Sequence, residues 1–178
     1  MADLGPVDWP PEPIRTDRVV LRQTEGGDRA RFIDLHASGE VCRYVGGSRA
    51  RAELENAVPQ IPGNRPGVFA VEREGVVIGT VSFARRDPER PGHVRPDGGE
   101  IELGYLFLPA AWGFGYASEA SRAALDWVAR GLPGEPVVLC TRSANTASVR
   151  LARRLGFVEV ERFEEFGAEQ WFGSWSAL

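Results

Sequence analysis

The residues from Glu100 to Ala129 constrain the fold most, because they predict a strand, a glycine-containing turn and a helix in direct succession. Side chains alternate between two faces from Glu100 to Leu108, which predicts a strand with Glu100 and Glu102 on the same face. Pro109 has no N–H to donate to a sheet, so the strand is expected to end there.

The turn that follows has the sequence Trp-Gly-Phe-Gly-Tyr-Ala over residues 112–117. After it, small and apolar residues recur at helical spacing, which predicts a helix with one buried side: Ala117, Ala120, Ser121, Ala124, Leu125 and Val128. A tight turn that leads into a helix N-terminus presents unpaired N–H groups to a phosphate. For a single G-x-G, the alternative is an ordinary connection in which the glycines only make the turn.

A second pattern begins at Asn145, about thirty residues after the glycine turn, with the expected strand 136–142 between them. Asn145 is a good N-cap, the next ten residues are amphipathic, and Gly156 is a good helix end. Taken alone, this pattern also suits an ordinary capped helix. The order strand, glycine turn, helix, strand and capped helix is far more specific than either motif alone.

Together these residues resemble the GNAT superfamily of N-acetyltransferases. The acyl-CoA-binding consensus of that family is [Q/R]-x-x-G-x-[G/A]. Trp112 stands in its first position, Gly115 is the fixed glycine and Ala117 the last small residue. The sequence I-R-T-D-R-V-V-L-R from residue 14 and the Trp at the turn resemble the RimJ/RimL branch, the ribosomal-protein N-terminal acetyltransferases. The resemblance covers roughly residues 14–166.

The resemblance implies an α+β fold with a mixed, mostly antiparallel sheet that parts near its middle and is flanked by helices. It implies acetyl-CoA, or another short acyl-CoA such as succinyl-CoA, as the cofactor. The pantetheine arm would pair with backbone on the strand and the pyrophosphate would bind the turn. The cofactor-binding residues so implied are Leu106, Phe107, Leu108, Gly113, Phe114, Gly115, Tyr116, Ala117, Ser118 and Asn145.

The reaction implied is direct attack of an amine on the thioester in a ternary complex. An ammonium must lose a proton before it attacks, and a carboxylate can receive that proton. Glu102 is the expected base, with Glu100 as the substitute on the same face; a structural glutamate is the alternative. Many relatives carry a tyrosine acid where this chain has Ala152. In the RimJ/RimL branch a serine three residues after the Asn is proposed instead, so the resemblance implies Ser148 as the acid, against the alternative of a packing serine.

The acceptor is expected to be a primary amine, either a protein N-terminal α-amine or a small molecule. Acidic residues such as Asp97, Glu100 and Glu102 would suit a cationic acceptor. Aromatic residues over 163–175 could line its pocket or pack on the sheet. Because the tyrosine acid is missing, a non-catalytic acyl-CoA sensor or scaffold is the alternative function. A dinucleotide site is set aside, since Ser118 stands where its third glycine would be.

The 178 residues predict one domain over 14–178, preceded by a proline-rich, flexible arm over 1–13. A net charge of −4 argues against a nucleic-acid partner. The start of the chain does not resemble a signal peptide and no apolar run could span a membrane, which predicts a cytoplasmic monomer or homodimer. Cys42 and Cys140 have no metal-ligand spacing, so no metal site is expected. All 21 basic residues are arginine, which excludes lysine chemistry.

The remaining segments predict further elements in chain order. A turn and strand are expected over 14–22, and helices over 28–37 and over 48–58 with Ser48 as N-cap. A hairpin is expected from 67–72 and 76–85, then a long exposed loop over 86–99, and a final strand pair from 157–166 and 169–175.

Overall fold

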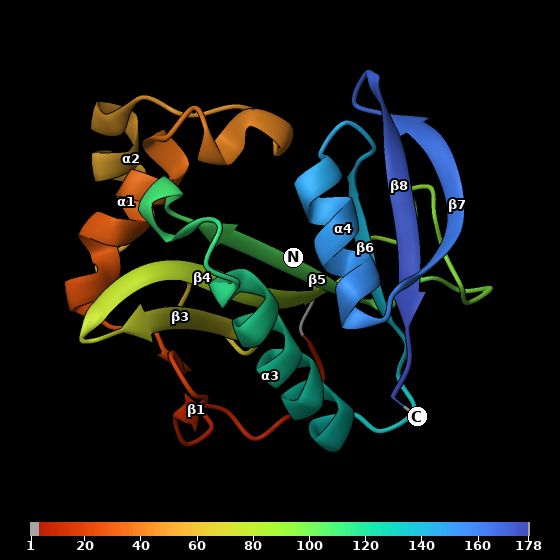
Figure 1. The fold of residues 1–178 in the computed structure, drawn as a ribbon, viewed down its shortest axis with the longest axis horizontal. Helices are drawn as coiled ribbons and strands as arrows, with labels where there is room; N and C mark the ends of the chain where they lie inside the picture. Colours follow the sequence, from red (N-terminus) through yellow and green to blue (C-terminus); the bar gives the residue numbers. More distant parts are fainter. Residues whose placement is uncertain (1–3, 178) are drawn as a thin grey trace. The chain divides into compact units, whose positions relative to one another are not determined.

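A computed structural model describes residues 4–177 of the chain (Figure 1). These residues form four α-helices and eight strands, in the order β1 (Ile14–Arg15), β2 (Val20–Gln23), α1 (Arg29–Ala37), α2 (Arg51–Ala57), β3 (Val68–Arg73), β4 (Val76–Arg85), β5 (Ile101–Phe107), α3 (Tyr116–Gly131), β6 (Val137–Arg142), α4 (Thr146–Leu155), β7 (Val158–Glu165) and β8 (Ala168–Trp175). Three short 3-10 turns complete the described part: η1 (Gly26–Asp28), η2 (Val41–Tyr44) and η3 (Pro109–Ala111).

The strands form one mixed sheet in the order β1-β2-β3-β4-β5-β6-β8-β7. The pairs β1–β2, β2–β3, β3–β4, β6–β8 and β7–β8 are antiparallel, whereas β5 and β6 run parallel and pair at Ile101↔Val137 and Glu102↔Val138. These pairs involve only the first two residues of each strand, as expected for a sheet that parts after this point. The mixed α/β fold predicted from the sequence is therefore confirmed.

The chain packs as two compact units, and strands β4 and β5 each contribute residues to both. One unit comprises residues 8–82 and 105–124. The other comprises the described residues 4–7, 83–104 and 125–177. The expectation of a single domain over 14–178 stays a prediction.

In the unit 8–82 with 105–124, the antiparallel strands β2, β3 and β4 carry the apolar core. The β3–β4 hairpin turns at Glu74 and Gly75, as predicted. Gly79 on β4 has a packing role, because a Cβ there would lie 2.5 Å from the Phe107 ring and 2.6 Å from the Leu106 carbonyl oxygen. A side chain at position 79 would push β5 away.

Both helices predicted in this unit are present, but the second begins later than predicted. The helix expected over 28–37 is confirmed as α1, preceded by η1. The N-cap expected at Ser48 is wrong: α2 begins at Arg51, and its N-cap Ala50 makes no side-chain cap. Residues 48–50 are not helical, so the Ser48 side chain lies too far from the first turn of α2 to cap it. Leu54 is the one buried residue of this helix.

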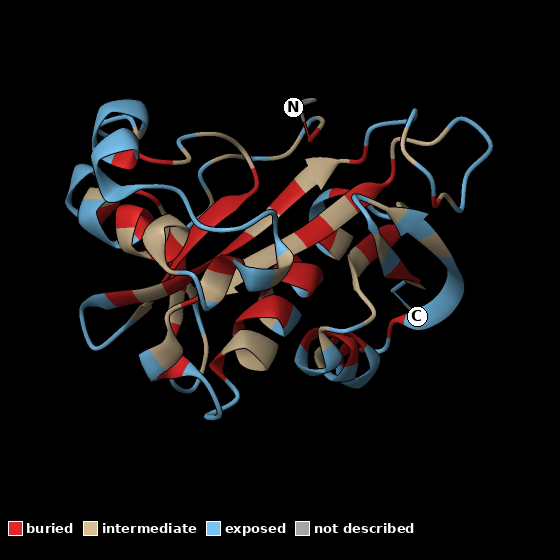
Figure 2. Ribbon diagram, turned by 90° about the horizontal axis from the view of Figure 1, so that it is seen from above, coloured by how far each residue is buried: buried red, intermediate tan, exposed pale blue. Residues whose placement is uncertain are grey.

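In the other unit, β8 pairs with both β6 and β7 and supplies the core residues Trp171 and Phe172. Strand β7 lies at the sheet edge and is exposed along most of its length (Figure 2). The loop predicted over 86–99 has no regular structure, but it is not simply exposed, because Arg86 is buried within it. Of the arm 1–13, Leu4 is buried and its carbonyl accepts a hydrogen bond from Arg85 Nε at 3.1 Å. The flexibility expected of that arm stays a prediction.

Candidate functional site

The glycine turn has the geometry of an anion-binding helix start. Gly113 and Gly115 have φ angles of 82° and 83°, a region that glycine adopts without strain. The Glu119 N–H donates to the Gly115 carbonyl at 3.0 Å, which is the first bond of α3. The N–H groups of residues 116–118 therefore precede the helical ladder and have no carbonyl within α3 to bind. Residues 112–115 are exposed, so these amides lie beside an accessible turn.

The end of β5 has two of its backbone groups engaged within the chain. The Leu108 N–H donates to the Ile78 carbonyl of β4 at 2.9 Å. The Trp112 indole N–H donates to the Phe107 carbonyl at 2.7 Å. Successive N–H groups of a strand point to opposite edges, so the Phe107 N–H is directed away from β4. Of the three residues expected to pair with pantetheine, Phe107 thus has the best placed donor.

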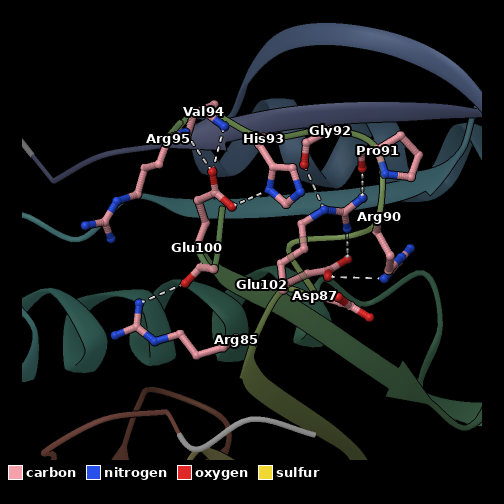
Figure 3. Close-up of polar contacts among 12 residues, drawn as sticks. Arg85, Asp87, Arg90, Pro91, Gly92, His93, Val94, Arg95, Glu100 and Glu102 are labelled. Atoms are coloured by element: carbon pink, nitrogen blue, oxygen red, sulfur yellow. Dashed lines mark hydrogen bonds and ion pairs between the residues drawn. The ribbon is translucent and has the colours of Figure 1, made fainter. Parts of the chain in front are cut away.

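The carboxylate of Glu102 lies between two arginines of the 86–99 loop (Figure 3). Its Oε1 is 3.0 Å from Arg86 Nη1, and its Oε2 is 3.5 Å from Arg90 Nη1. The Glu102 side chain is half-buried, whereas that of Arg86 is fully buried. The carboxylate is thus held in one orientation, and part of it stays accessible to a partner.

Arg86 and Arg90 were not predicted to belong to the site. Arg86 also donates to the carbonyls of Gly92, at 2.8 Å from Nε, and of Pro91, so its guanidinium ties the loop to β5. Arg90 makes a two-bond pair with Glu165 of β7, at 2.9 and 2.8 Å. Sequence alone gives no signal for this cluster, because all of its contacts except those with Pro91 and Gly92 join different segments.

Glu100 is fully buried and acts as the anchor of the loop (Figure 3). Its Oε1 accepts from the N–H groups of Val94 and Arg95 at 2.7 and 2.8 Å, and its Oε2 lies 2.8 Å from His93 Nδ1. Burial by itself would raise the pKa of Glu100, but the bonds from His93 and the backbone outweigh burial and keep that pKa below its ordinary value. Glu100 therefore has a structural role, and the expectation that it could substitute as the base is not supported.

Helix α4 carries the two remaining predicted residues. The Asn145 Oδ1 accepts from the Ser148 N–H at 3.2 Å, so Asn145 is the N-cap as predicted, and Gly156 ends the helix at φ 99°. Ser148 is buried in the first turn of the helix. Ala152 is also buried. Because an alanine has no hydroxyl, this position cannot supply the acid that the resemblance to tyrosine-bearing relatives would place there.

The predicted acceptor features are only partly supported. Glu100 is enclosed and Glu102 is paired with arginines, so neither presents an unbalanced negative charge to a cation. Trp171 and Phe172 are core residues, so much of the aromatic tail packs in the interior.

Burial raises the pKa of the Cys140 thiol, which favours the neutral form expected of a packing residue.

Within residues 4–177, no group of three or more His, Cys, Asp or Glu side chains could hold a metal ion. No helix among these described residues is long and apolar enough to cross a lipid bilayer.

Comparison with known proteins shows the family and the fold of this chain. Residues 18–158 match the acetyltransferase (GNAT) domain family. The chain is 27% identical over 155 residues to the uncharacterized N-acetyltransferase p20 of Bacillus licheniformis, and the aligned region covers 82% of each of the two proteins. Its fold is similar to that of a GNAT-family acetyltransferase from Bacillus anthracis, with a TM-score of 0.75 at 20% identity over 92% of this chain and 98% of that one.

A second solved structure with this fold contains a bound cofactor. It is RimL, the ribosomal L7/L12 α-N-protein acetyltransferase, in complex with coenzyme A. The TM-score is 0.71 at 17% identity, over 93% of this chain and 98% of RimL. The family match spans most of the sequence and includes the glycine turn, Glu102 and Asn145. This chain is therefore a member of the GNAT acetyltransferase family.

Proposed function

We propose that this acetyltransferase transfers the acetyl group of acetyl-CoA to a primary amine by direct attack within a ternary complex. The observation that carries the proposal is the exposed turn 112–115, with its two positive-φ glycines, directly before the amides that precede the hydrogen-bond ladder of α3. A pyrophosphate fits such a turn, because several N–H groups and the positive end of a 16-residue helix converge there. RimL, which shares the fold, is known in complex with coenzyme A.

The cofactor-binding roles follow from the groups that the fold leaves available. Gly113 to Ser118 would bind the pyrophosphate through backbone amides, with the Ser118 hydroxyl as a further donor. The Phe107 N–H would pair with the pantetheine arm, flanked by Leu106 and Leu108. Because the Asn145 side-chain oxygen caps α4, its amide NH₂ would be the group that binds the pantetheine region.

The chemical roles are assigned to Glu102 and Ser148. Bound acetyl-CoA supplies the thioester that the amine attacks. Glu102 receives the amine proton directly or through one water while the new C–N bond forms. Ser148 would donate a proton to the sulfur as the C–S bond breaks, so that CoA leaves as the thiol, and the proton held by Glu102 would return to Ser148 through water. The two arginines beside Glu102 fix the orientation of its carboxylate before an acceptor binds.

The acceptor class is proposed more broadly, as a protein N-terminal α-amine or a small-molecule amine. Several finer points stay predictions. They are membership of the RimJ/RimL branch, the preference for acetyl over other short acyl groups, the cytoplasmic location, the lack of nucleic-acid and membrane partners, and the monomeric or homodimeric state. The alternative of a non-catalytic acyl-CoA sensor is not favoured, because the family consists of acetyltransferases and Glu102 is present.

The test is release of free CoA thiol from acetyl-CoA against a panel of amines, with calorimetric titration of acetyl-CoA in parallel. The panel contains N-terminal peptides, aminoglycosides, polyamines and amino acids, and succinyl-CoA serves as the donor control. We expect acceptor-dependent thiol release with at least one class of amine. Tight acetyl-CoA binding without release for any amine would favour the sensor, and no binding would remove the cofactor assignment.

A further inference from the structure

An acidic residue of α3, Glu119, joins the helix that follows the glycine turn to Thr16 and Arg18. Glu119 lies in the first turn of the helix, and its Oε1 accepts from the Thr16 hydroxyl at 2.7 Å and from the Arg18 N–H at 2.9 Å. Its Oε2 accepts from Arg18 Nε at 2.7 Å and pairs with Arg18 Nη2 at 2.6 Å. The T-x-R sequence near residue 16 and the S-E-A sequence after the turn, 103 positions apart, are thus joined directly.

The same guanidinium group also reaches the turn itself. Arg18 Nη1 donates to the carbonyl oxygen of Phe114 at 2.8 Å, and the guanidinium carbon lies 4.9 Å from the centre of the Tyr116 ring. Arg18 therefore holds three points at once: the carboxylate of α3, one peptide of the turn, and the first aromatic ring of the helix. A planar fork can make such contacts simultaneously, whereas an ammonium group cannot.

The bond to Phe114 determines where the next amide points. In a planar trans peptide, the carbonyl of one residue and the N–H of the next point in opposite directions. Because the Phe114 carbonyl is directed at Arg18, the Gly115 N–H of the same peptide is directed away from Arg18. That is the direction required for an amide that binds an anion in front of the turn, with Arg18 behind it.

The ion pair also controls the local charge. An ionised glutamate in the first helical turn would repel a nearby anion if its charge were not balanced. Burial by itself would raise the pKa of Glu119, but the bonds from Thr16 and Arg18 outweigh burial and keep that pKa low. The carboxylate is thus ionised at neutral pH, and Arg18 is the cation that balances it.

We propose that Arg18 is a positioning residue of the cofactor turn: it orients the peptide between Phe114 and Gly115 and neutralises Glu119, so that the turn can accept the CoA pyrophosphate. This inference rests on the function proposed above. It assigns to Arg18 no contact with the cofactor and no role in acyl transfer, so its effect should appear in cofactor affinity and in KM, with kcat at saturation unchanged.

The chain offers a matched control in Arg73. Its guanidinium carbon lies 5.1 Å from the centre of the same Tyr116 ring, and 42% of its side chain is exposed, against 47% for Arg18. Arg73 pairs with its neighbour Glu74 at 3.1 Å, on the β3–β4 hairpin. Arg73→Met therefore removes an equally exposed arginine from the same ring while leaving the Phe114 carbonyl and Glu119 contacts in place.

The experiment is calorimetric titration of CoA into the unaltered protein and into Arg18→Met, Arg18→Lys, Arg73→Met and the double variant Arg18→Met with Glu119→Gln. Amide hydrogen exchange at residues 113–118 is measured on the cofactor-free proteins. We expect Arg18→Met to weaken CoA binding by about tenfold or more, Arg18→Lys to restore only part of the affinity, and Arg73→Met to change it by less than about twofold. Exchange at the turn should accelerate in Arg18→Met and stay unchanged in Arg73→Met.

The double variant separates the two contributions. If Arg18 only screened Glu119, removal of both charges would restore full affinity, and the orienting role would be overturned. Equal CoA affinity in Arg18→Met and in the unaltered protein would overturn the inference while leaving the proposed function intact. No CoA binding by the unaltered protein would instead overturn the proposed function, and this inference with it.

Discussion

The turn 112–115 and the loop 86–99 are both irregular and both contain glycine, but they obtain their shape in different ways. The turn is short and exposed, and its two positive-φ glycines define its course locally. The loop is folded around buried charges, because the carboxylate of Glu100, directly before β5, accepts from its backbone N–H groups and Arg86 donates to its carbonyls. The proposed cofactor turn thus depends on glycine backbone geometry held by one exposed arginine, whereas buried charges shape the surroundings of the proposed base.

The largest effect is expected when an anion is placed in the turn. Gly115→Glu should weaken CoA binding by about a hundredfold or more, because its side chain would start 3.5 Å from Arg18 Nη2, compete for the guanidinium that holds the turn, and add a negative charge beside the proposed pyrophosphate site. The matched control is Gly115→Ala, which carries the same backbone strain at φ 83° without the charge, and whose Cβ would lie at an ordinary 3.5 Å from Arg18 Nη2. Calorimetric titration of CoA measures both variants. Similar affinities for Ala and Glu would mean that strain, and not an anion site, explains the loss.

The next effect concerns the base. Glu102→Gln should lower kcat by about a hundredfold or more while leaving acetyl-CoA affinity nearly unchanged, since a general base contributes about that much. Glu165→Gln is the control, because Glu165 binds the same Arg90 but has no proposed chemical role. Steady-state rates over a range of pH distinguish the two. An unchanged rate for Glu102→Gln at every pH would exclude Glu102 as the base.

The smallest effect concerns the loop anchor. Glu100→Gln should lower the free energy of unfolding at neutral pH by about 1–3 kcal/mol, because a charge-assisted set of buried bonds becomes neutral. The folded-state pKa of Glu100 is lowered, so its contribution is complete above the unfolded pKa of about 4.3 and is lost as the pH falls through the folded value. The difference between the variant and the unaltered protein should therefore shrink in acid. Urea unfolding at several pH values measures it.

The surface variant Asp97→Asn is the control for that experiment, since Asp97 is an exposed carboxylate of the same loop. It should change the free energy of unfolding by less than about 0.5 kcal/mol. A difference for Glu100→Gln that stays constant down to strongly acidic pH would mean that ionisation of Glu100 does not stabilise the loop.

The sequence could predict the features that depend on local backbone geometry, but not those that depend on contacts between distant charges. The strand before the turn, the helix after it, the cap at Asn145 and both hairpins depend on residues close together in the chain, and all are confirmed. Proline, glycine and asparagine set backbone geometry wherever they stand, so their positions can be interpreted without a fold.

The ion-pair cluster around Glu102 could not be predicted, because its members come from three separated segments: the 86–99 loop, β5 and β7. Arg90 reaches Glu165 across 75 positions of sequence, and in a separate pair Arg18 reaches Glu119 across 101. Periodicity placed Glu100 and Glu102 on one face and suggested similar roles for them. In the structure, one is enclosed by loop amides and the other is held between guanidinium groups. Only the folded chain distinguishes such neighbours.

The arginine contacts have a further chemical consequence. Among the described residues, every arginine–carboxylate ion pair has a guanidinium where other proteins can have a lysine ammonium, because the sequence contains no lysine. A lysine ε-amine that sheds its proton can be acylated by a thioester, whereas an arginine stays protonated and is a poor nucleophile at physiological pH. The arginines that orient Glu102 and the glycine turn would therefore be inert toward an acyl donor. The charges that shape each region cannot become substrates of the reaction they support.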